Sequence, residues 1–285
     1  MSATPYKSIA VLGLGTVATP LVKELLGHGA SVLVITRPSS TSRNVPEGAQ
    51  HAAIDYSNVS ALTDAFRKHN VEVVVSTVNH NSINTQPPTA EAAKRAGVKL
   101  YVPSEYGLAS GGQTQGVLGE KSRFIDSLVA ADIPYLRLYV GGFIEWIPFL
   151  LGLPETGKLN IIGEGTTRGS FTALDDIAGF LAYILTHTPP SQLHNATLRI
   201  QGDRKSLREI AALYDGKVEI AQIAEFPADI PEAGLRTFLQ KEFEVGVGST
   251  GFDAAKGRDD EQLAGSSNSL WRGQQWKTVK EVLNL

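Results

Sequence analysis

The 285-residue chain is 42% hydrophobic and 19% charged, a composition typical of globular proteins. Its formal net charge of −3 provides no basic surface for nucleic acid or an anionic membrane, and no segment approaches the roughly 20 apolar residues of a membrane span. The absence of cysteine excludes disulfides, thiolate zinc sites and a cysteine nucleophile, and the histidines form no i, i+4 pair that would suggest a metal site. Because the N-terminal sequence carries no export signal, we expect a cytoplasmic protein.

Apolar runs alternate with helical patterns through the first half of the chain. The apolar runs predict strands at Ile9–Leu12, Ser31–Ile35, Ala52–Ile54, Val71–Thr77, Leu100–Pro103 and Pro134–Val140. Helices are predicted between them, one ending near Gly27, others over 58–69 and 87–96, and one carrying Lys121. This order predicts an α/β fold of Rossmann type, a doubly wound parallel sheet with helices on both faces.

A glycine-rich loop follows the first predicted strand. Gly13-Leu14-Gly15-Thr16-Val17-Ala18 has the G-x-G-x-x-A spacing, and it opens a helix, which is the context in which this pattern binds dinucleotides. Gly13 permits the tight turn and Gly15 lets the backbone approach a pyrophosphate, which the helix N-terminus then stabilises. We therefore expect Gly13, Gly15, Thr16 and Val17 to bind the cofactor; the alternative is an ordinary strand–helix turn.

The residues after the second strand indicate which dinucleotide is bound. Binders of NAD usually carry an acidic residue there for the ribose 2′-hydroxyl, whereas this chain has Arg37 and no carboxylate before Glu47. An arginine pairs with a 2′-phosphate through two hydrogen bonds. The sequence therefore predicts NADP(H), with Ser39, Ser40 and Arg43 as further donors; the alternative is an ordinary surface arginine.

Ligands of such sheets bind beyond the carboxyl ends of the strands. This rule places the backbone of Thr77, Val78 and Asn79 beside the cofactor, and later Val140 and Gly142. Phe143 and Trp146 follow, and we expect them either in an apolar wall of the substrate pocket or in the core. Glu105 lies at another strand end, either near the cofactor or simply binding turn N–H groups, and Asp175 and Asp176 resemble a helix cap.

Lys121 occupies an apolar stripe. Val117, Phe124, Ile125 and Leu128 lie four residues before it and three, four and seven after it, which is the spacing of one helical face. A partly desolvated lysine in a pocket has a lowered pKa and serves as a proton donor or acceptor near neutrality. The alternative is a lysine that buries its aliphatic stem and extends its ammonium group to solvent.

The C-terminal third is less regular and richer in glycine and charge. We therefore assign residues 1–145 to an NADP-binding Rossmann core, to which elements around 168–201 return. Residues 146–285 are assigned mainly to a smaller substrate-binding lobe. We expect this lobe to close over the ligand crevice.

Several motifs together carry a family resemblance. They are the Gly-rich loop ending in Ala18, Thr36-Arg37, Val102-Pro103-Ser104-Glu105-Tyr106-Gly107, Lys121 at the next helix, and Ser170-Phe171-Thr172-Ala173-Leu174-Asp175-Asp176-Ile177-Ala178. As a set, they resemble the NmrA-like, isoflavone-reductase-like branch of the atypical short-chain dehydrogenases/reductases. The resemblance runs from residue 8 to about residue 215, and Ser266–Val279 looks like fungal members in particular.

The resemblance implies a Rossmann core that binds NADPH and a smaller C-terminal substrate lobe. It also implies reductases of aromatic or phenylpropanoid-like small molecules. By the same resemblance, Pro103 and Ser104 lie along the cofactor, Tyr106 and Phe143 belong to the substrate pocket, and Lys121 takes part in catalysis. The family also includes redox-sensing regulators that bind the dinucleotide and reduce nothing.

The usual catalytic pair of short-chain dehydrogenases, Tyr-x-x-x-Lys, is absent, since no tyrosine near the predicted strand ends has a lysine four residues later. Lys121 is then expected to move a proton, to act as a fixed positive charge, or to hold the nicotinamide ribose. The sequence favours an NADPH-dependent reductase that transfers hydride to an enone or benzylic carbon of an aromatic small molecule. The alternatives are a non-catalytic NADP(H) sensor that regulates a protein partner, and a non-redox isomerase or cyclase.

Overall fold

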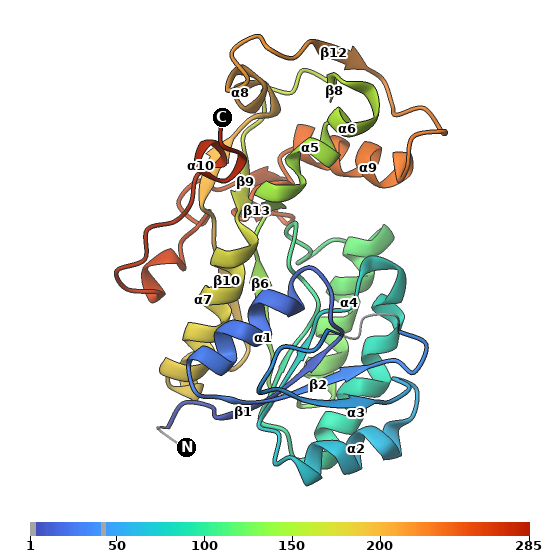
Figure 1. Ribbon diagram of the computed structural model, residues 1–285, viewed down its shortest axis with the longest axis vertical. Coiled ribbons are helices and arrows are strands. Elements are labelled where there is room, and N and C mark those ends of the chain that lie inside the picture. The colour runs from blue at the N-terminus through green and yellow to red at the C-terminus, as the bar shows by residue number, and fades with distance from the viewer. Residues whose placement is uncertain (1–3, 41–43) are drawn as a thin grey trace. The chain divides into compact units, whose positions relative to one another are not determined.

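The computed structural model describes residues 4–40 and 44–285, so Arg43 lies outside the described residues. The chain divides into two compact units (Figure 1). Unit 1 comprises Met1–Glu105, Ser110–Leu138 and Ile177–Leu198, and unit 2 comprises Tyr106–Ala109, Tyr139–Asp176 and Arg199–Leu285. The assignment of a cofactor core to 1–145 and a substrate lobe to 146–285 stays a prediction.

The described part of unit 1 contains a five-stranded parallel sheet in the order β3-β2-β1-β4-β5. Its strands are β1 (Ser8–Leu12), β2 (Ser31–Thr36), β3 (Gln50–Ala53), β4 (Val73–Ser76) and β5 (Leu100–Val102). In β4 every residue is buried, as expected for a strand covered on both faces. The predicted α/β fold and parallel sheet are thus confirmed.

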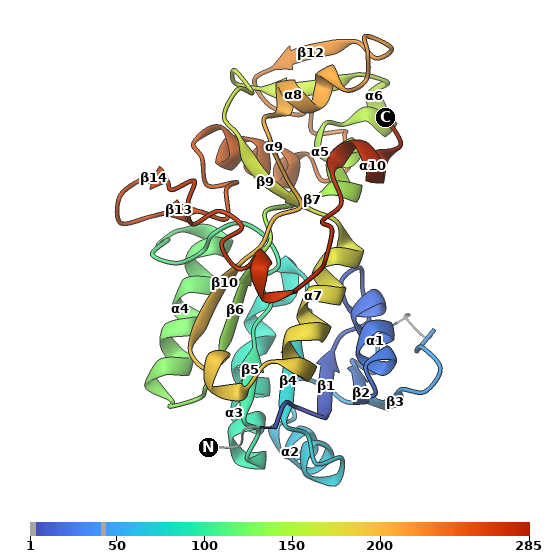
Figure 2. The ribbon, with the colours of Figure 1, turned by 90° about the vertical axis from the view of Figure 1, so that its left-hand side faces the viewer.

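Helices cover both faces of this sheet (Figures 1 and 2). One face carries α2 (Val59–Lys68), α3 (Gln86–Ala96) and α4 (Gly116–Ala130), and the other carries α1 (Ala18–Gly27) and α7 (Leu174–His187). A 3₁₀ helix, η1 (His80–Thr85), leads into α3, and η3 (Pro190–Gln192) follows α7. The Asn58 side chain accepts a hydrogen bond of 3.0 Å from Ala61 N and so caps α2.

The sixth predicted strand is β6 (Leu136–Tyr139), which pairs with β10 (Ala196–Arg199). It is not joined to β5 by a continuous ladder. A single parallel bridge links Tyr101 to Tyr135, and Tyr101 N donates to Pro134 O at 2.8 Å. The start of β6 therefore lies next to β5, which places Arg137 of β6 near the end of β5.

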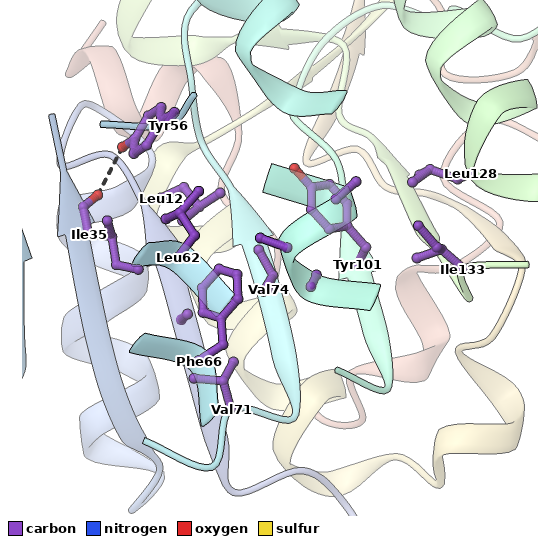
Figure 3. Close-up of a cluster of buried hydrophobic side chains, with 14 of the residues drawn as sticks. Leu12, Ile35, Tyr56, Leu62, Phe66, Val71, Val74, Tyr101, Leu128 and Ile133 are labelled. Carbon is purple, nitrogen blue, oxygen red and sulfur yellow. Dashed lines mark hydrogen bonds between the residues drawn. The ribbon is translucent and has the colours of Figure 1, made fainter. Parts of the chain in front are cut away.

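One hydrophobic cluster of unit 1 lies between the sheet and the three helices of its first face (Figure 3). Leu12 and Val74 of the sheet are fully buried in the same cluster as Leu62 and Phe66 of α2. The hydroxyl of Tyr56 donates to Ile35 O at 2.9 Å, which satisfies a polar atom buried inside this cluster (Figure 3). The cluster fixes the sheet and therefore the loops at its carboxyl edge.

Unit 2 consists of small sheets and short helices. Its ladders join β7 (Gly142–Phe143), β9 (Gly169–Thr172) and β11 (Asp203–Lys205); β8 (Leu159–Ile162) and β12 (Ile220–Ile223); and β13 (Phe252–Asp253) and β14 (Arg258–Asp259). Its helices are η2 (Ile144–Trp146), α5 (Ile147–Leu150), α6 (Leu153–Thr156), α8 (Leu207–Ala212), α9 (Ala233–Glu244), η4 (Asn268–Leu270) and α10 (Val279–Leu283).

A buried arginine connects the helices of unit 2. Arg236 of α9 is fully buried, and its two terminal nitrogens donate to the Glu155 carboxylate of α6 at 2.7 and 2.6 Å. Its guanidinium carbon lies 4.1 Å from the ring centroid of Phe149, at cation–π distance. Since both the charge and the planar face of Arg236 have partners, this residue is structural.

Asp175 and Asp176 lie in the first turn of α7, but neither is its N-cap. Leu174 N donates instead to the Glu145 carboxylate at 3.0 Å. Asp176 accepts from Lys277 N at 2.8 Å, and Asp175 pairs with Lys277 Nζ at 2.9 Å. The interpretation of these aspartates as a cap is therefore wrong in part: they hold the C-terminal segment against the start of α7.

Through residues 4–40 and 44–285, every helix is too short or too polar to cross a bilayer.

Two valines of unit 1 test the importance of the core. Val74 is fully buried in β4, whereas Val129 on α4 is 60% exposed. We expect Val74→Ala to lower the free energy of unfolding by about 2 kcal/mol, because two buried methyl groups are lost and a cavity remains. Val129→Ala, measured in the same urea titration, should leave it within about 0.5 kcal/mol. Equal effects of the two substitutions would contradict this account of the core.

Candidate active site

The glycine-rich loop begins with a turn that only glycine fits. Gly13 has a φ of +100°, and its N–H donates to Ile35 O at 2.8 Å. A Cβ atom at this position would lie 3.0 Å from Thr77 Oγ1, which itself donates to Leu12 O at 2.8 Å. The structure thus brings together Gly13 and Thr77, two residues that the sequence predicted at the cofactor.

The rest of the loop has space for a ligand. A Cβ built on Gly15 would meet no atom within 4 Å, so the backbone here is open to an approaching group. Thr16 is exposed, whereas the side chain of Val17 is buried and leaves only its backbone for binding. Val17 occupies the N-cap of α1 and cannot cap it with a side chain, and the first turn carries no acidic residue. These features suit the pyrophosphate of a dinucleotide.

Arg37 and Ser39 follow β2 and are exposed. Sequence reasoning missed a carboxylate close to them, Asp55, which follows the neighbouring strand β3. Hydrogen bonds from Ser57 N at 2.9 Å and Ser57 Oγ at 2.8 Å lower the pKa of Asp55, and the positive charge of Arg37 lowers it further. Adjacent parallel strands end at one edge of the sheet, and this rule is the signal that would have found Asp55.

The ends of β4 and β5 are tied together by Ser104. Its hydroxyl donates to Val78 O at 2.6 Å, and its N–H donates to the buried Gln86 Oε1 at 2.8 Å. Asn79 is exposed at the start of η1, and Pro103 is buried directly after β5. Unit 1 therefore brings these predicted residues to the carboxyl edge of the same sheet as the glycine-rich loop.

The Lys121 side chain extends from α4 to this edge of the sheet. Phe124, Ile125 and Leu128 of α4 are buried in the core, as the spacing predicts, while Lys121 is half-buried. Its Nζ donates to the main-chain carbonyl oxygen of Glu105 at 2.7 Å. The ammonium group is thus held at the end of β5.

The Glu105 side chain has its own partners beneath that carbonyl. Oε1 accepts from Ser110 Oγ at 2.9 Å and lies 3.3 Å from Nε of Arg137. The side chains of Glu105 and Arg137 are only 1% and 11% exposed. Sequence reasoning missed Ser110 and Arg137, although an arginine within the apolar strand Leu136–Tyr139 was a usable signal.

Burial and charge act against each other in this cluster. Burial lowers the pKa of Lys121, and the nearby Glu105 carboxylate opposes that shift. Burial raises the pKa of Glu105, and the charges of Lys121 and Arg137, with the Ser110 hydrogen bond, oppose it. Each partner therefore stabilises the charged form of the other.

The remaining predicted residues belong to unit 2: Tyr106, Val140, Gly142, Phe143 and Trp146. Val140 O accepts from Thr172 Oγ1 at 2.6 Å, and Gly142 and Phe143 form β7, which pairs with β9. The rings of Phe143 and Trp146 meet edge to face at 5.2 Å, and Trp146 is 40% exposed. These two rings lie outside the core of unit 2, whereas Tyr106 is buried.

Within the described parts of the chain, no group of three or more histidine and acidic side chains is arranged to hold a metal ion.

Known proteins share both sequence and fold with this chain. Residues 5–127 match the NmrA-like family. Phenylcoumaran benzylic ether reductase PT1 of Pinus taeda is 28% identical over 232 residues, which are 72% of either chain. A probable pinoresinol-lariciresinol reductase of Arabidopsis thaliana is 30% identical over 173 residues, which are 56% of this chain and 55% of that protein.

The N-terminal part of this chain, residues 5–127, is thus similar to the NmrA-like family. The chain resembles the isoflavone-reductase-like reductases, as the sequence motifs predict, and the expected enzyme class, an atypical short-chain oxidoreductase, is confirmed. The solved complex of leucoanthocyanidin reductase with NADPH from Vitis vinifera has the same fold, with a TM-score of 0.79. It is 19% identical and covers 97% of this chain and 98% of its own.

A single added methyl group tests the open space above the glycine-rich loop. Gly15→Ala should preserve the stability of the protein, because the added Cβ meets no atom of the protein. It should raise the Kd for NADPH about tenfold or more, because the methyl group occupies the space of the pyrophosphate. Gly27→Ala, at the end of α1, also adds a Cβ in open space and serves as the control. Fluorescence titration with NADPH measures both; an unchanged Kd for Gly15→Ala would reject the assigned cofactor position.

Proposed function

We propose that this protein is an NADPH-dependent reductase of aromatic, phenylpropanoid-like small molecules. The observation that carries the proposal is the Lys121 ammonium group, which is held at the end of β5 by Glu105 O on the same sheet edge as the glycine-rich loop. A cation fixed at this edge serves a reaction in which negative charge develops on the substrate.

The residues of unit 1 fit the cofactor in three respects. Gly13 makes the turn and Gly15 leaves its surface open, as a pyrophosphate requires. Arg37 is exposed after β2 and suits a 2′-phosphate, with Ser39 and Ser40 beside it. The Ser104–Val78 hydrogen bond fixes the loops along which we expect the nicotinamide half to lie.

When bound, NADPH would supply a hydride to an electrophilic carbon of the substrate. For an enone, the hydride adds to the β-carbon and the electron pair of the π bond moves to the carbonyl oxygen. For a benzylic ether, the hydride adds to the benzylic carbon as the C–O bond breaks, and the pair remains on the phenolic oxygen. In both cases an oxygen gains negative charge, which the Lys121 ammonium would stabilise or protonate.

The named relatives support this substrate class. One is named a phenylcoumaran benzylic ether reductase, and another a probable pinoresinol-lariciresinol reductase. In unit 2, the exposed Trp146 and the partly exposed Phe143, which meet edge to face, provide flat apolar surface of the kind that an aromatic ligand contacts. We assign this pair and Tyr106 to the substrate.

The choice of NADPH over NADH rests on Arg37. Arg37→Ala should weaken NADPH binding about 30-fold, because a charge-assisted contact to the 2′-phosphate is lost, and leave NADH binding within about twofold. Arg95→Ala removes an exposed arginine that pairs with Glu91 on α3 and should change neither Kd. Calorimetric titration of both cofactors measures the ratio, and an unaltered ratio in Arg37→Ala would mean that the arginine is an ordinary surface residue.

The role of Lys121 distinguishes an enzyme from a sensor. Lys121→Ala should reduce kcat for enones and aromatic benzylic ethers about 100-fold or more while NADPH still binds, because the developing anion loses its cation. Lys23→Ala, on the exposed face of α1, is the control and should keep full activity. A wild-type protein that binds NADPH tightly but oxidises it with no member of the substrate panel would favour the sensor. Conversion of a substrate without net NADPH oxidation would favour an isomerase or cyclase.

A further inference from the structure

Glu105 makes two kinds of contact, one through its main-chain carbonyl oxygen and one through its side-chain carboxylate. Its main-chain carbonyl oxygen accepts from Lys121 Nζ at 2.7 Å, while its carboxylate lies buried beneath, with Oε1 bound to Ser110 and near Arg137. The second oxygen, Oε2, is buried and has no hydrogen-bond partner among the described residues. A carboxylate that stabilises a turn accepts hydrogen bonds from backbone N–H groups. Partners of the Glu105 carboxylate are instead the Ser110 hydroxyl and the Arg137 guanidinium.

Burying such a carboxylate is costly unless its charge is used. Transfer of an isolated carboxylate from water into the interior is strongly unfavourable, and an oxygen without a hydrogen-bond partner adds to that cost. The carboxylate therefore depends on the two cations beside it, Lys121 and Arg137.

Three secondary-structure elements bring these charges together. Glu105 follows β5, Arg137 lies in β6, and Lys121 lies in the second turn of α4. Among the described residues, the charges that act on Glu105 are those of Lys121 and Arg137, and the charge that acts on Lys121 is that of Glu105.

Among the described residues, η1 and α3 also pack against α4, and neither brings a charge that acts on Lys121 or Glu105. The titratable side chain of η1, His80, is exposed. On α3, Glu91 pairs with Arg95, and Lys94 donates to Ala131 O beyond the far end of α4. The titration of Lys121 is thus expected to respond chiefly to Glu105.

We propose that Glu105 is a positioning residue for Lys121: its carbonyl oxygen orients the ammonium group, and its carboxylate, supported by Ser110 and Arg137, keeps that group charged. Two cations and one carboxylate leave one net positive charge, which suits an anion developing on a substrate oxygen. Lys121 has three N–H donors and Glu105 O takes one, so the lysine is anchored while it retains donors for a ligand. This inference rests on the proposed function for its catalytic meaning, but its electrostatic part applies to the protein alone.

The test removes the charge and keeps the shape. In Glu105→Gln the carbonyl oxygen and side-chain volume stay, and the Lys121 ammonium loses its counter-charge. The pH at which Lys121 titrates should fall by about one unit. In protein labelled with ¹³Cε-lysine, the pH dependence of the Lys121 NMR signal gives this titration pH directly, without substrate or turnover. The Lys121 signal is assigned as the one that is missing in Lys121→Arg. Where the protein turns over substrate, the alkaline limb of the kcat/KM profile should move by the same amount while the NADPH Kd stays within about twofold.

Two further variants separate charge from structural damage. Glu105→Asp keeps the charge and should return the Lys121 titration and the alkaline limb toward those of the wild type. Glu120→Gln removes an exposed charge one residue before Lys121 and should change neither measurement. An identical Lys121 titration in wild type and folded Glu105→Gln would overturn the proposal, as would a shift of equal size in Glu120→Gln. A shifted titration in a protein without turnover would keep Glu105 as the partner of Lys121 and reject the reductase function instead.

Discussion

The parallel sheet of unit 1, whose strands β1, β2, β4 and β5 are buried almost throughout, is the constraint on which the rest of this protein depends. Strands such as β4 admit no exposed residue, so polar groups that bind or react must lie where the strands end. Parallel strands all end at the same edge. For this reason Gly13, Arg37, Thr77, Ser104 and Glu105, which are spread over more than ninety residues of sequence, belong to one edge of one sheet.

At this edge the structure meets two different demands. In the glycine-rich loop, two positions carry no side chain: Gly13 lies close to Thr77, and Gly15 leaves open space. Around the end of β5, charges are gathered and partly buried, with Lys121 bound to the carbonyl of Glu105 and the carboxylate bound in turn. Burial raises the energy of each charge in isolation, so the cluster is stable only as a set. This mutual dependence is what holds the lysine in place.

Sequence patterns predicted the elements of unit 1 well because burial on both faces imposes long apolar runs. The helical phase around Lys121 was also sound, since Phe124, Ile125 and Leu128 lie in the core. The patterns were less successful where a side chain acts at a distance along the chain. Asp175 and Asp176 resembled a helix cap, but the structure assigns the cap to Glu145 and uses Asp176 to bind residue 277. Such pairings join segments about thirty and one hundred residues apart, and no local pattern encodes them.

The sequence by itself determined the α/β fold, the glycine turn and the placement of an arginine after the second strand, because each follows from local spacing and from the conformational freedom of glycine. Only the tertiary structure decided what surrounds Lys121. Arg137 and Ser110 reach Glu105 because β6 begins beside β5 and because the loop after β5 folds back on itself. The electrostatic environment of a buried charge is a sum over neighbours in space, and the chain specifies those neighbours only once it has folded.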